Sequence, residues 1–105
     1  MIYMIQETEM KNEVNPDRLE EWLIKNPEKV YKRSVETALY LAKNKDLIEE
    51  SFMEFTWEDQ IYSKIFMKRK DIPTAMNKAI EYFVKTELYE YAQMAKEAKD
   101  YFENI

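Results

Sequence analysis

The side chains that could carry chemistry in this 105-residue chain are carboxylates, tyrosines and lysines, because the sequence contains no histidine and no cysteine. That composition excludes a zinc site of the usual kind, a Ser-His or Cys-His nucleophile and a disulfide. Acidic residues nevertheless recur at helical spacing in two segments: Asp46, Glu49, Glu50 and Glu54, and then Glu97 and Asp100. Carboxylates placed in this way could hold Mg²⁺, which prefers oxygen ligands.

Acid pairs on two helices that face each other resemble the carboxylate motifs of all-helical nucleotide pyrophosphatases. The resemblance implies Mg²⁺-dependent nucleotide hydrolysis that depends on Glu50 and Glu97. The first segment departs from that family's Glu-Glu-x-x-Glu spacing, and acids three or four residues apart are common on solvated helices. We therefore predict that the protein is not an enzyme, and we expect no metal and no cofactor.

The absence of glycine shapes the prediction of the fold. A chain of this length would carry about seven glycines at average usage. Phosphate-binding loops and the dinucleotide-binding turn need glycine where the backbone approaches the ligand, so both are excluded. Tight hairpins also draw on glycine, which argues against a sandwich or a barrel.

Helix signals punctuate the chain. Asn15-Pro16-Asp17 and Asn26-Pro27-Glu28 each pair a cap residue with proline at the first helical position. Apolar residues then predict helices at 17–23, at 27–44, from 46 onward, at 56–70 and at 74–102. The predicted fold is all-α: a single domain over 1–105, an irregular bundle of about five or six helices with a long C-terminal helix. Residues 1–14 are expected to form a short strand or a disordered arm.

The last predicted helix carries tyrosines opposite its core-facing side. Tyr82 and Tyr89 lie seven residues apart, and aromatic residues are enriched at the centres of interfaces. Glu87 falls on the core-facing side unless the helix breaks near Thr86 and turns it outward; otherwise it pairs with a cation or belongs to a site. Both interior packing and self-association remain alternative uses of the tyrosines.

Charge is distributed in blocks, acidic over 46–59 and basic over 64–70, which favours electrostatically directed docking. The predicted function is a non-catalytic protein–protein interaction module, an adaptor or inhibitor with an aromatic patch and a charged rim. The residues predicted to contact the partner protein are Tyr82, Tyr89, Tyr40, Glu49, Glu50, Met53 and Glu54. The same face could form a homo-oligomer.

Binding to nucleic acid is the alternative. Residues 64–70, a short turn and the segment from Thr74 could form a helix-turn-helix, with Lys78 and Lys85 facing phosphate. Separately, the segment from Lys32 to Leu39 resembles the second helix of ribbon-helix-helix repressors, which implies a DNA-binding transcriptional regulator. The strand that this family places before the helices would fall around 10–14. The net charge of −5 counts against both patterns.

The opening apolar run, residues 1–5, is far too short to span a membrane and lacks a basic flank. No membrane partner is expected, and the absence of cysteine fits a reducing compartment, so the predicted location is cytoplasmic. The bias toward Phe, Tyr, Met, Ile, Asn and Lys is typical of AT-rich genomes, which is consistent with an accessory protein of a phage or mobile element.

Overall fold

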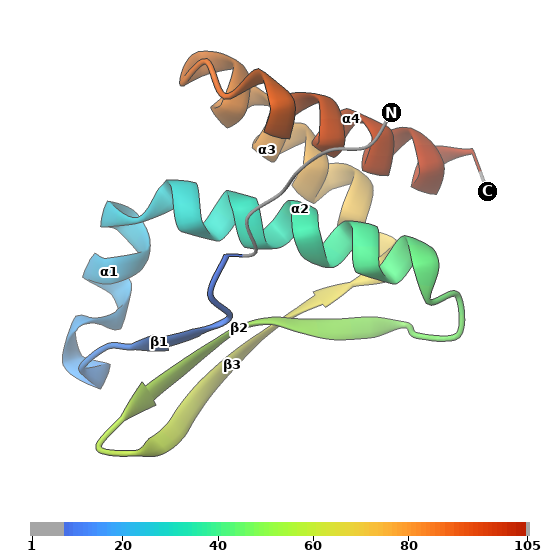
Figure 1. Ribbon diagram of the computed structural model, residues 1–105. Coiled ribbons are helices and arrows are strands. Elements are labelled where there is room, and N and C mark those ends of the chain that lie inside the picture. Colours follow the sequence, from blue (N-terminus) through green and yellow to red (C-terminus); the bar gives the residue numbers. More distant parts are fainter. Residues whose placement is uncertain (1–7, 105) are drawn as a thin grey trace.

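The computed structural model describes residues 8–104, whose helices and strands are stacked in three layers (Figure 1). In chain order the elements are β1 (Lys11–Glu13), α1 (Leu19–Lys25), α2 (Pro27–Lys43), β2 (Glu49–Trp57), β3 (Gln60–Lys68), α3 (Ile72–Lys85) and α4 (Tyr89–Glu103), with single 3₁₀ turns at Pro16–Arg18 and Arg69–Asp71. The sheet forms one outer layer, α2 the middle layer, and the α3–α4 pair the other outer layer (Figure 1).

The predicted all-α bundle is wrong, because residues 49–57 and 60–68 form a β-hairpin and not helices. The separation of Ile61 and Ile65 misleads, since four residues return to the same side of both a helix and a strand. The exposure of successive residues distinguishes a strand from a helix here. Lys64, Phe66 and Lys68 are exposed, whereas the intervening Ile65 and Met67 are half-buried or buried, which is the period of a strand.

The turn of this hairpin adopts a left-handed backbone without glycine. Glu58 has φ 50° and Asp59 has φ 62°, the combination that a type I′ turn requires. Each such residue costs roughly 1–2 kcal/mol relative to ordinary backbone geometry. Burial of Met53 and Phe55, which are fully inaccessible on β2, offsets that cost. The missing glycines therefore exclude particular ligand-binding loops but do not exclude a tight hairpin.

The sheet has the order β1-β2-β3. β1 runs parallel to β2, from the pair Lys11↔Glu54 to the pair Glu13↔Thr56, and the connection between these strands contains α1 and α2. β2 and β3 are antiparallel, with two irregularities in register. Of the N-terminal segment expected to be a strand or an arm, Lys11–Glu13 form β1, and residues 1–7 lie outside the described part of the chain.

Helix α2 packs on both of its sides, which explains its central position. It begins at Pro27, as the Asn26-Pro27 signal predicts, and Val35, Ala38 and Leu41 have no accessible surface. Helix α1 also closes over the sheet: the Trp22 ring meets the Phe55 ring edge to face, with centroids 5.4 Å apart. The core therefore lies on the helical side of the sheet.

The long C-terminal helix is also a wrong prediction, since the chain breaks between Lys85 and Tyr89. The amide of Leu88 donates to the carbonyl of Phe83 at 2.8 Å, and the amide of Glu87 donates to the carbonyl of Val84 at 3.2 Å. These two bonds define a Schellman motif, whose left-handed position is occupied by Glu87 with φ 62°. Glu87 is exposed there, so no carboxylate is buried in the core at this point.

No helix within residues 8–104 has the length and apolar character needed to cross a bilayer.

Candidate functional site

The two tyrosines predicted at the centre of a docking patch have different environments. Tyr82 is half-buried and stacks on Tyr31 of α2, with ring centroids 4.9 Å apart. Burial, with the nearby charge of Glu28 and the Tyr31 hydroxyl, raises the pKa of Tyr82. Tyr89, at the start of α4, is 61% exposed. Tyr82 therefore joins α3 to α2 inside the fold, while Tyr89 points to solvent.

The other predicted partner contacts do not join this pair in one surface. Tyr40 is exposed on α2, nine residues beyond Tyr31 and therefore about 13 Å further along the helix. Glu49 is exposed and Glu50 half-buried at the start of β2. Met53 is fully buried in the core. A partner could reach the exposed members of this set only at separate places.

Glu54 lies inside the sheet and not on a rim. It is 7% exposed, and one of its carboxylate oxygens lies 3.8 Å from the Lys64 Nζ on the neighbouring strand. The register places Lys11 beside it on the other flank. Its second oxygen, Oε2, is buried without a hydrogen-bond partner in the described residues. Glu54 thus compensates the lysines beside it and offers little charge to an incoming molecule.

The acidic segments do not form the arrangement that the pyrophosphatase resemblance implies. Asp46 lies in the loop before β2, and Glu49, Glu50 and Glu54 lie on a strand, so only the α4 acids, Glu97 and Asp100, are on a helix. Within residues 8–104, no group of three or more acidic side chains is close enough together to hold a metal ion.

The segments predicted to bind DNA also do not form the arrangement that was expected of them. Residues 64–68 belong to β3, so the helix-turn-helix predicted from Lys64 onward is not formed. The segment from Lys32 to Leu39 is inside α2, between the sheet and the helical pair, and β1 pairs with β2 of the same chain. Lys78 and Lys85 are exposed on α3.

Both borders of the sheet lack a further strand partner in the described residues, and the longer of the two is β3. β3 is the last strand in the sheet order, and among the described residues its only strand partner is β2 (Figure 1). Its nine residues include Ile61, 46% exposed, and Phe66, 51% exposed. We call the exposed side chains of this strand, Gln60, Ile61, Lys64, Phe66 and Lys68, the β3 edge. An unpaired strand presents alternate N–H and C=O groups to the outside.

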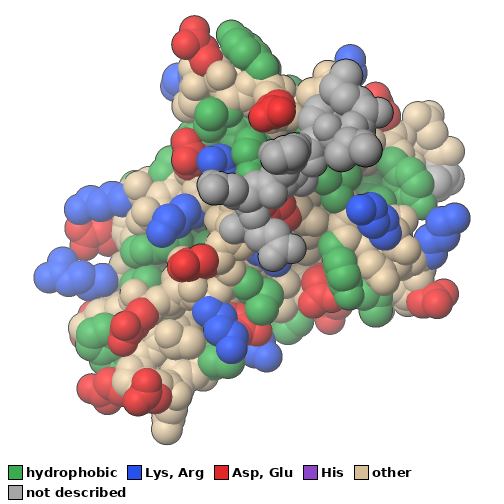
Figure 2. All heavy atoms as spheres, viewed as in Figure 1, with side chains coloured by type: hydrophobic (Ala, Val, Ile, Leu, Met, Phe, Trp, Pro, Cys, Tyr) green, Lys and Arg blue, Asp and Glu red, His purple; other side chains and the backbone are tan. Residues whose placement is uncertain are grey.

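Large apolar side chains are exposed along the whole hairpin. Half of those exposed in the described chain belong to it or to the residue before it: Ile48, Trp57, Ile61 and Phe66. Near these apolar residues, the acidic and the basic side chains lie in different parts of the hairpin. Acidic side chains gather at the end of the molecule where the β2–β3 turn lies, with Glu58 and Asp59 at the turn (Figure 2). Basic residues follow along the β3 edge, at Lys64 and Lys68.

Arg69 holds the base of the hairpin against two helices. Its Nε donates to the Leu47 carbonyl at 2.8 Å, and its Nη2 donates to the carbonyls of Leu41 at 2.6 Å and Asn44 at 2.8 Å. The guanidinium lies 5.3 Å from the ring centroid of Phe102 on α4. It therefore neutralises the free carbonyl end of α2 and fixes the direction in which β3 leaves the core.

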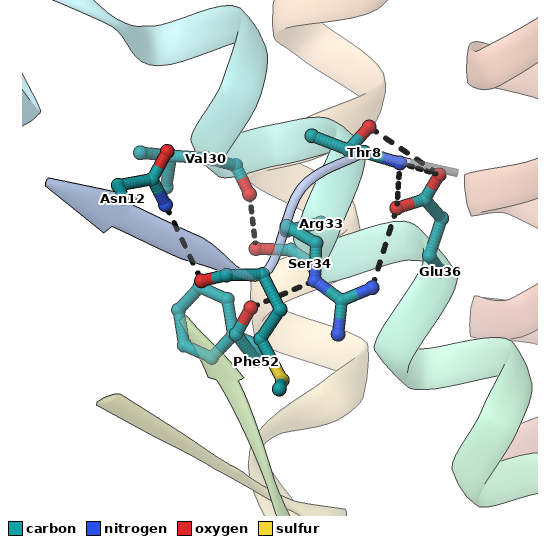
Figure 3. A network of polar contacts seen from close by, with 8 residues as sticks. Thr8, Asn12, Val30, Arg33, Ser34, Glu36 and Phe52 are labelled. Atoms are coloured by element: carbon teal, nitrogen blue, oxygen red, sulfur yellow. Dashed lines mark hydrogen bonds and ion pairs between the residues drawn. The ribbon is translucent and has the colours of Figure 1, made fainter. Parts of the chain in front are cut away.

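A second polar cluster attaches β2 to α2 (Figure 3). Arg33 Nε donates to the Phe52 carbonyl at 2.8 Å, and Arg33 Nη1 lies 3.5 Å from Glu36 Oε1. The Thr8 amide donates to both oxygens of Glu36, at 3.2 and 3.1 Å. Desolvation raises the pKa of Glu36, although the Thr8 amide and the Arg33 charge act in the opposite direction. These contacts hold β2, and through it β3, in a fixed orientation.

Comparison of the chain with protein-family models, with curated proteins and with solved structures gave no match. The function must be inferred from the chain's own residues. Sequence reasoning missed the β3 edge because it assigned residues 56–70 to a helix. The residue types over 64–68 do not alternate between polar and apolar, because Phe66 lies between Ile65 and Met67. The available strand signal is the enrichment of β-branched and aromatic residues at Ile61, Tyr62, Ile65 and Phe66.

Proposed function

We propose that this protein is a non-catalytic interaction domain that binds an extended segment of another protein along the β3 edge. The observation that carries the proposal is a nine-residue border strand whose only strand partner in the described chain is β2 and whose exposed side chains include Ile61 and Phe66. An extended peptide can pair with such a strand through its main chain while its alternate side chains contact the strand's own.

Main-chain pairing and apolar burial both favour binding at this strand. A hydrogen bond contributes a net ~0.5–1.5 kcal/mol, and in a strand the length of β3 about four or five residues each direct one N–H and one C=O outward, which makes about eight to ten groups. Burial of Ile61 and Phe66 adds to this through the hydrophobic effect, at about 25 cal/mol per Å². Because α2, Arg33 and Arg69 already hold the hairpin, little of this free energy is lost in ordering β3.

The exposed residues singled out in the sequence have a secondary role in this proposal. Tyr89 and Tyr40 lie on helices outside the hairpin. Glu49 precedes Met53 on β2 and pairs in register with Lys68 at the far end of the β3 edge. We also propose a cytoplasmic location, which the absence of cysteine supports.

Site-specific photocrosslinking tests this function. Phe66 is replaced by a photoreactive phenylalanine analogue, and Ile24, which is 73% exposed on α1, is replaced in a matched control. In an extract of the source cells we expect position 66 to form a crosslink to a different protein and position 24 to form none. Crosslinks from position 24 alone, or crosslinks from position 66 only to further copies of this chain, would contradict the proposal.

A further inference from the structure

The charges along the β3 edge are of one sign. From Gln60 to Lys70 the sequence has no acidic residue, while Lys64, Lys68 and Lys70 are exposed. Arg69 in the same run is committed to three backbone carbonyls, so it is not available to a partner. An incoming strand therefore meets lysines, and β2 places an acidic residue beside both of those on β3: Glu54 lies 3.8 Å from Lys64, and Glu49 pairs in register with Lys68.

The lysines are arranged with the period of the strand. Lys64, Phe66 and Lys68 alternate with the less exposed Ile65 and Met67, so they project from the same face of β3. A paired strand places its own side chains directly opposite these three, with Cβ atoms about 4.5–5.5 Å apart. Position by position, the complement of this face is an acidic residue, an apolar residue and an acidic residue.

A second copy of this chain does not supply that complement. A symmetric dimer pairs β3 with itself in the antiparallel sense, and full-length pairing of 60–68 sets Lys64 opposite Lys64 of the second copy. The register centred on Phe66 sets Lys64 opposite Lys68, and the register centred on Ile65 leaves the same lysines diagonal to one another. Directly opposed like charges are destabilising, so the strand disfavours its own copy in the first two of these registers. In the register centred on Ile65, Lys64 faces Phe66 and Lys68 faces Tyr62, so neither lysine meets an acidic residue.

We propose that the β3 edge accepts an extended segment of a different protein with the pattern acidic-x-apolar-x-acidic. The acidic residues pair with Lys64 and Lys68, and the apolar residue packs on Phe66. This inference rests on the proposed function, since it names the chemistry of the segment that pairs with the strand. Main-chain pairing and contact with Phe66 provide the affinity, whereas Lys64 and Lys68 select among the segments that could bind.

The experiment uses two capped nine-residue peptides and the full chain labelled with ¹⁵N. In one peptide the first and fifth residues are glutamate, the third is valine and the rest are threonine, so antiparallel pairing with 60–68 sets the glutamates opposite Lys68 and Lys64 and the valine opposite Phe66. In the other peptide, lysine replaces both glutamates. Titration followed by amide shifts is expected to perturb residues 60–68 and to give at least about tenfold tighter binding of the glutamate peptide at low salt.

Variants distinguish charge selection from pairing. The double change Lys64→Gln and Lys68→Gln is expected to remove the tenfold preference, whereas Lys78→Gln, on the exposed face of α3, leaves it intact. Equal binding of both peptides by the unmodified chain would overturn the acidic pattern and leave strand addition standing. Absence of shifts in residues 60–68 with either peptide would overturn both. Tighter binding of a single-stranded oligonucleotide at the same residues would also overturn this inference, because the lysines would then be recognising phosphate.

Discussion

Replacement of Arg69 by methionine tests how the hairpin is held in place. The side chain donates to the carbonyls of Leu41, Asn44 and Leu47, all within 2.6–2.8 Å, and covers the ring of Phe102. Methionine keeps the apolar stem and removes every donor, so the loss reports the guanidinium itself.

The magnitude follows from these contacts. A hydrogen bond to a charged group contributes about 1.5–3 kcal/mol, which gives a gross sum of about 4.5–9 kcal/mol for three. The Asn44 and Leu47 carbonyls belong to the loop between α2 and β2, where water can replace the lost donor. Leu41 is fully buried, so its carbonyl on α2 lacks that replacement. We therefore expect Arg69→Met to lower the free energy of unfolding by about 3 kcal/mol.

The assay is urea unfolding followed by circular dichroism, with Lys70→Met as the exposed neighbour control. The control is expected to change stability by less than about 0.5 kcal/mol. Arg69→Lys keeps the charge but cannot reach three carbonyls at once, so about half of the loss should remain. If Arg69→Met costs less than about 1 kcal/mol, or no more than the Lys70 control, the role assigned to Arg69 is refuted.

Four further substitutions have defined outcomes. Glu87→Gly relieves a left-handed backbone and should stabilise the protein by roughly 0.5–1 kcal/mol in thermal unfolding; a loss of stability would contradict the Schellman geometry. Because the pKa of Glu36 is raised in the folded state, its contribution to stability is greatest below the ordinary glutamate value of 4.5 and is lost as the pH rises through the folded pKa. Glu36→Gln should therefore gain stability relative to the unmodified chain between pH 4 and pH 7, and a parallel pH profile would show that the carboxyl group does not titrate in this way. Met53→Ala should cost about 2–5 kcal/mol because the residue is fully buried, whereas Phe66→Lys should cost less than about 0.5 kcal/mol while abolishing crosslinking and peptide binding. Equal destabilisation by these last two changes would place Phe66 in the core.

The sequence predicted the helices that have both a start signal and sustained periodicity. α2 was expected over 27–44 and is found at Pro27–Lys43, because Asn26-Pro27 and the 3.6-residue pattern agree. The hairpin was missed because its turn uses Glu58 and Asp59 where the usual signal is asparagine or glycine. No local pattern marks such a turn when its cost is met by the burial of side chains elsewhere.

Tertiary packing also decides which side chains are exposed, and the local sequence does not show this. Tyr82 was expected on an outward face of a continuous helix, but the break at Glu87 folds α4 back on α3, and Tyr82 stacks on Tyr31 of α2. Met53 was expected at a partner surface, but it lies on the side of β2 that α2 covers. Periodicity indicates which residues share a side of an element. It does not indicate which strand of a sheet is left at the border.

Amide hydrogen exchange of the complex formed with the crosslinked partner is the most direct test of strand addition at β3. The full chain is compared alone and with the purified partner, and protection is measured residue by residue. Strand pairing predicts slower exchange at alternate amides of residues 60–68, with no comparable change over α1 and α3. Protection confined to the helices, with exchange in 60–68 unchanged, would contradict the central claim.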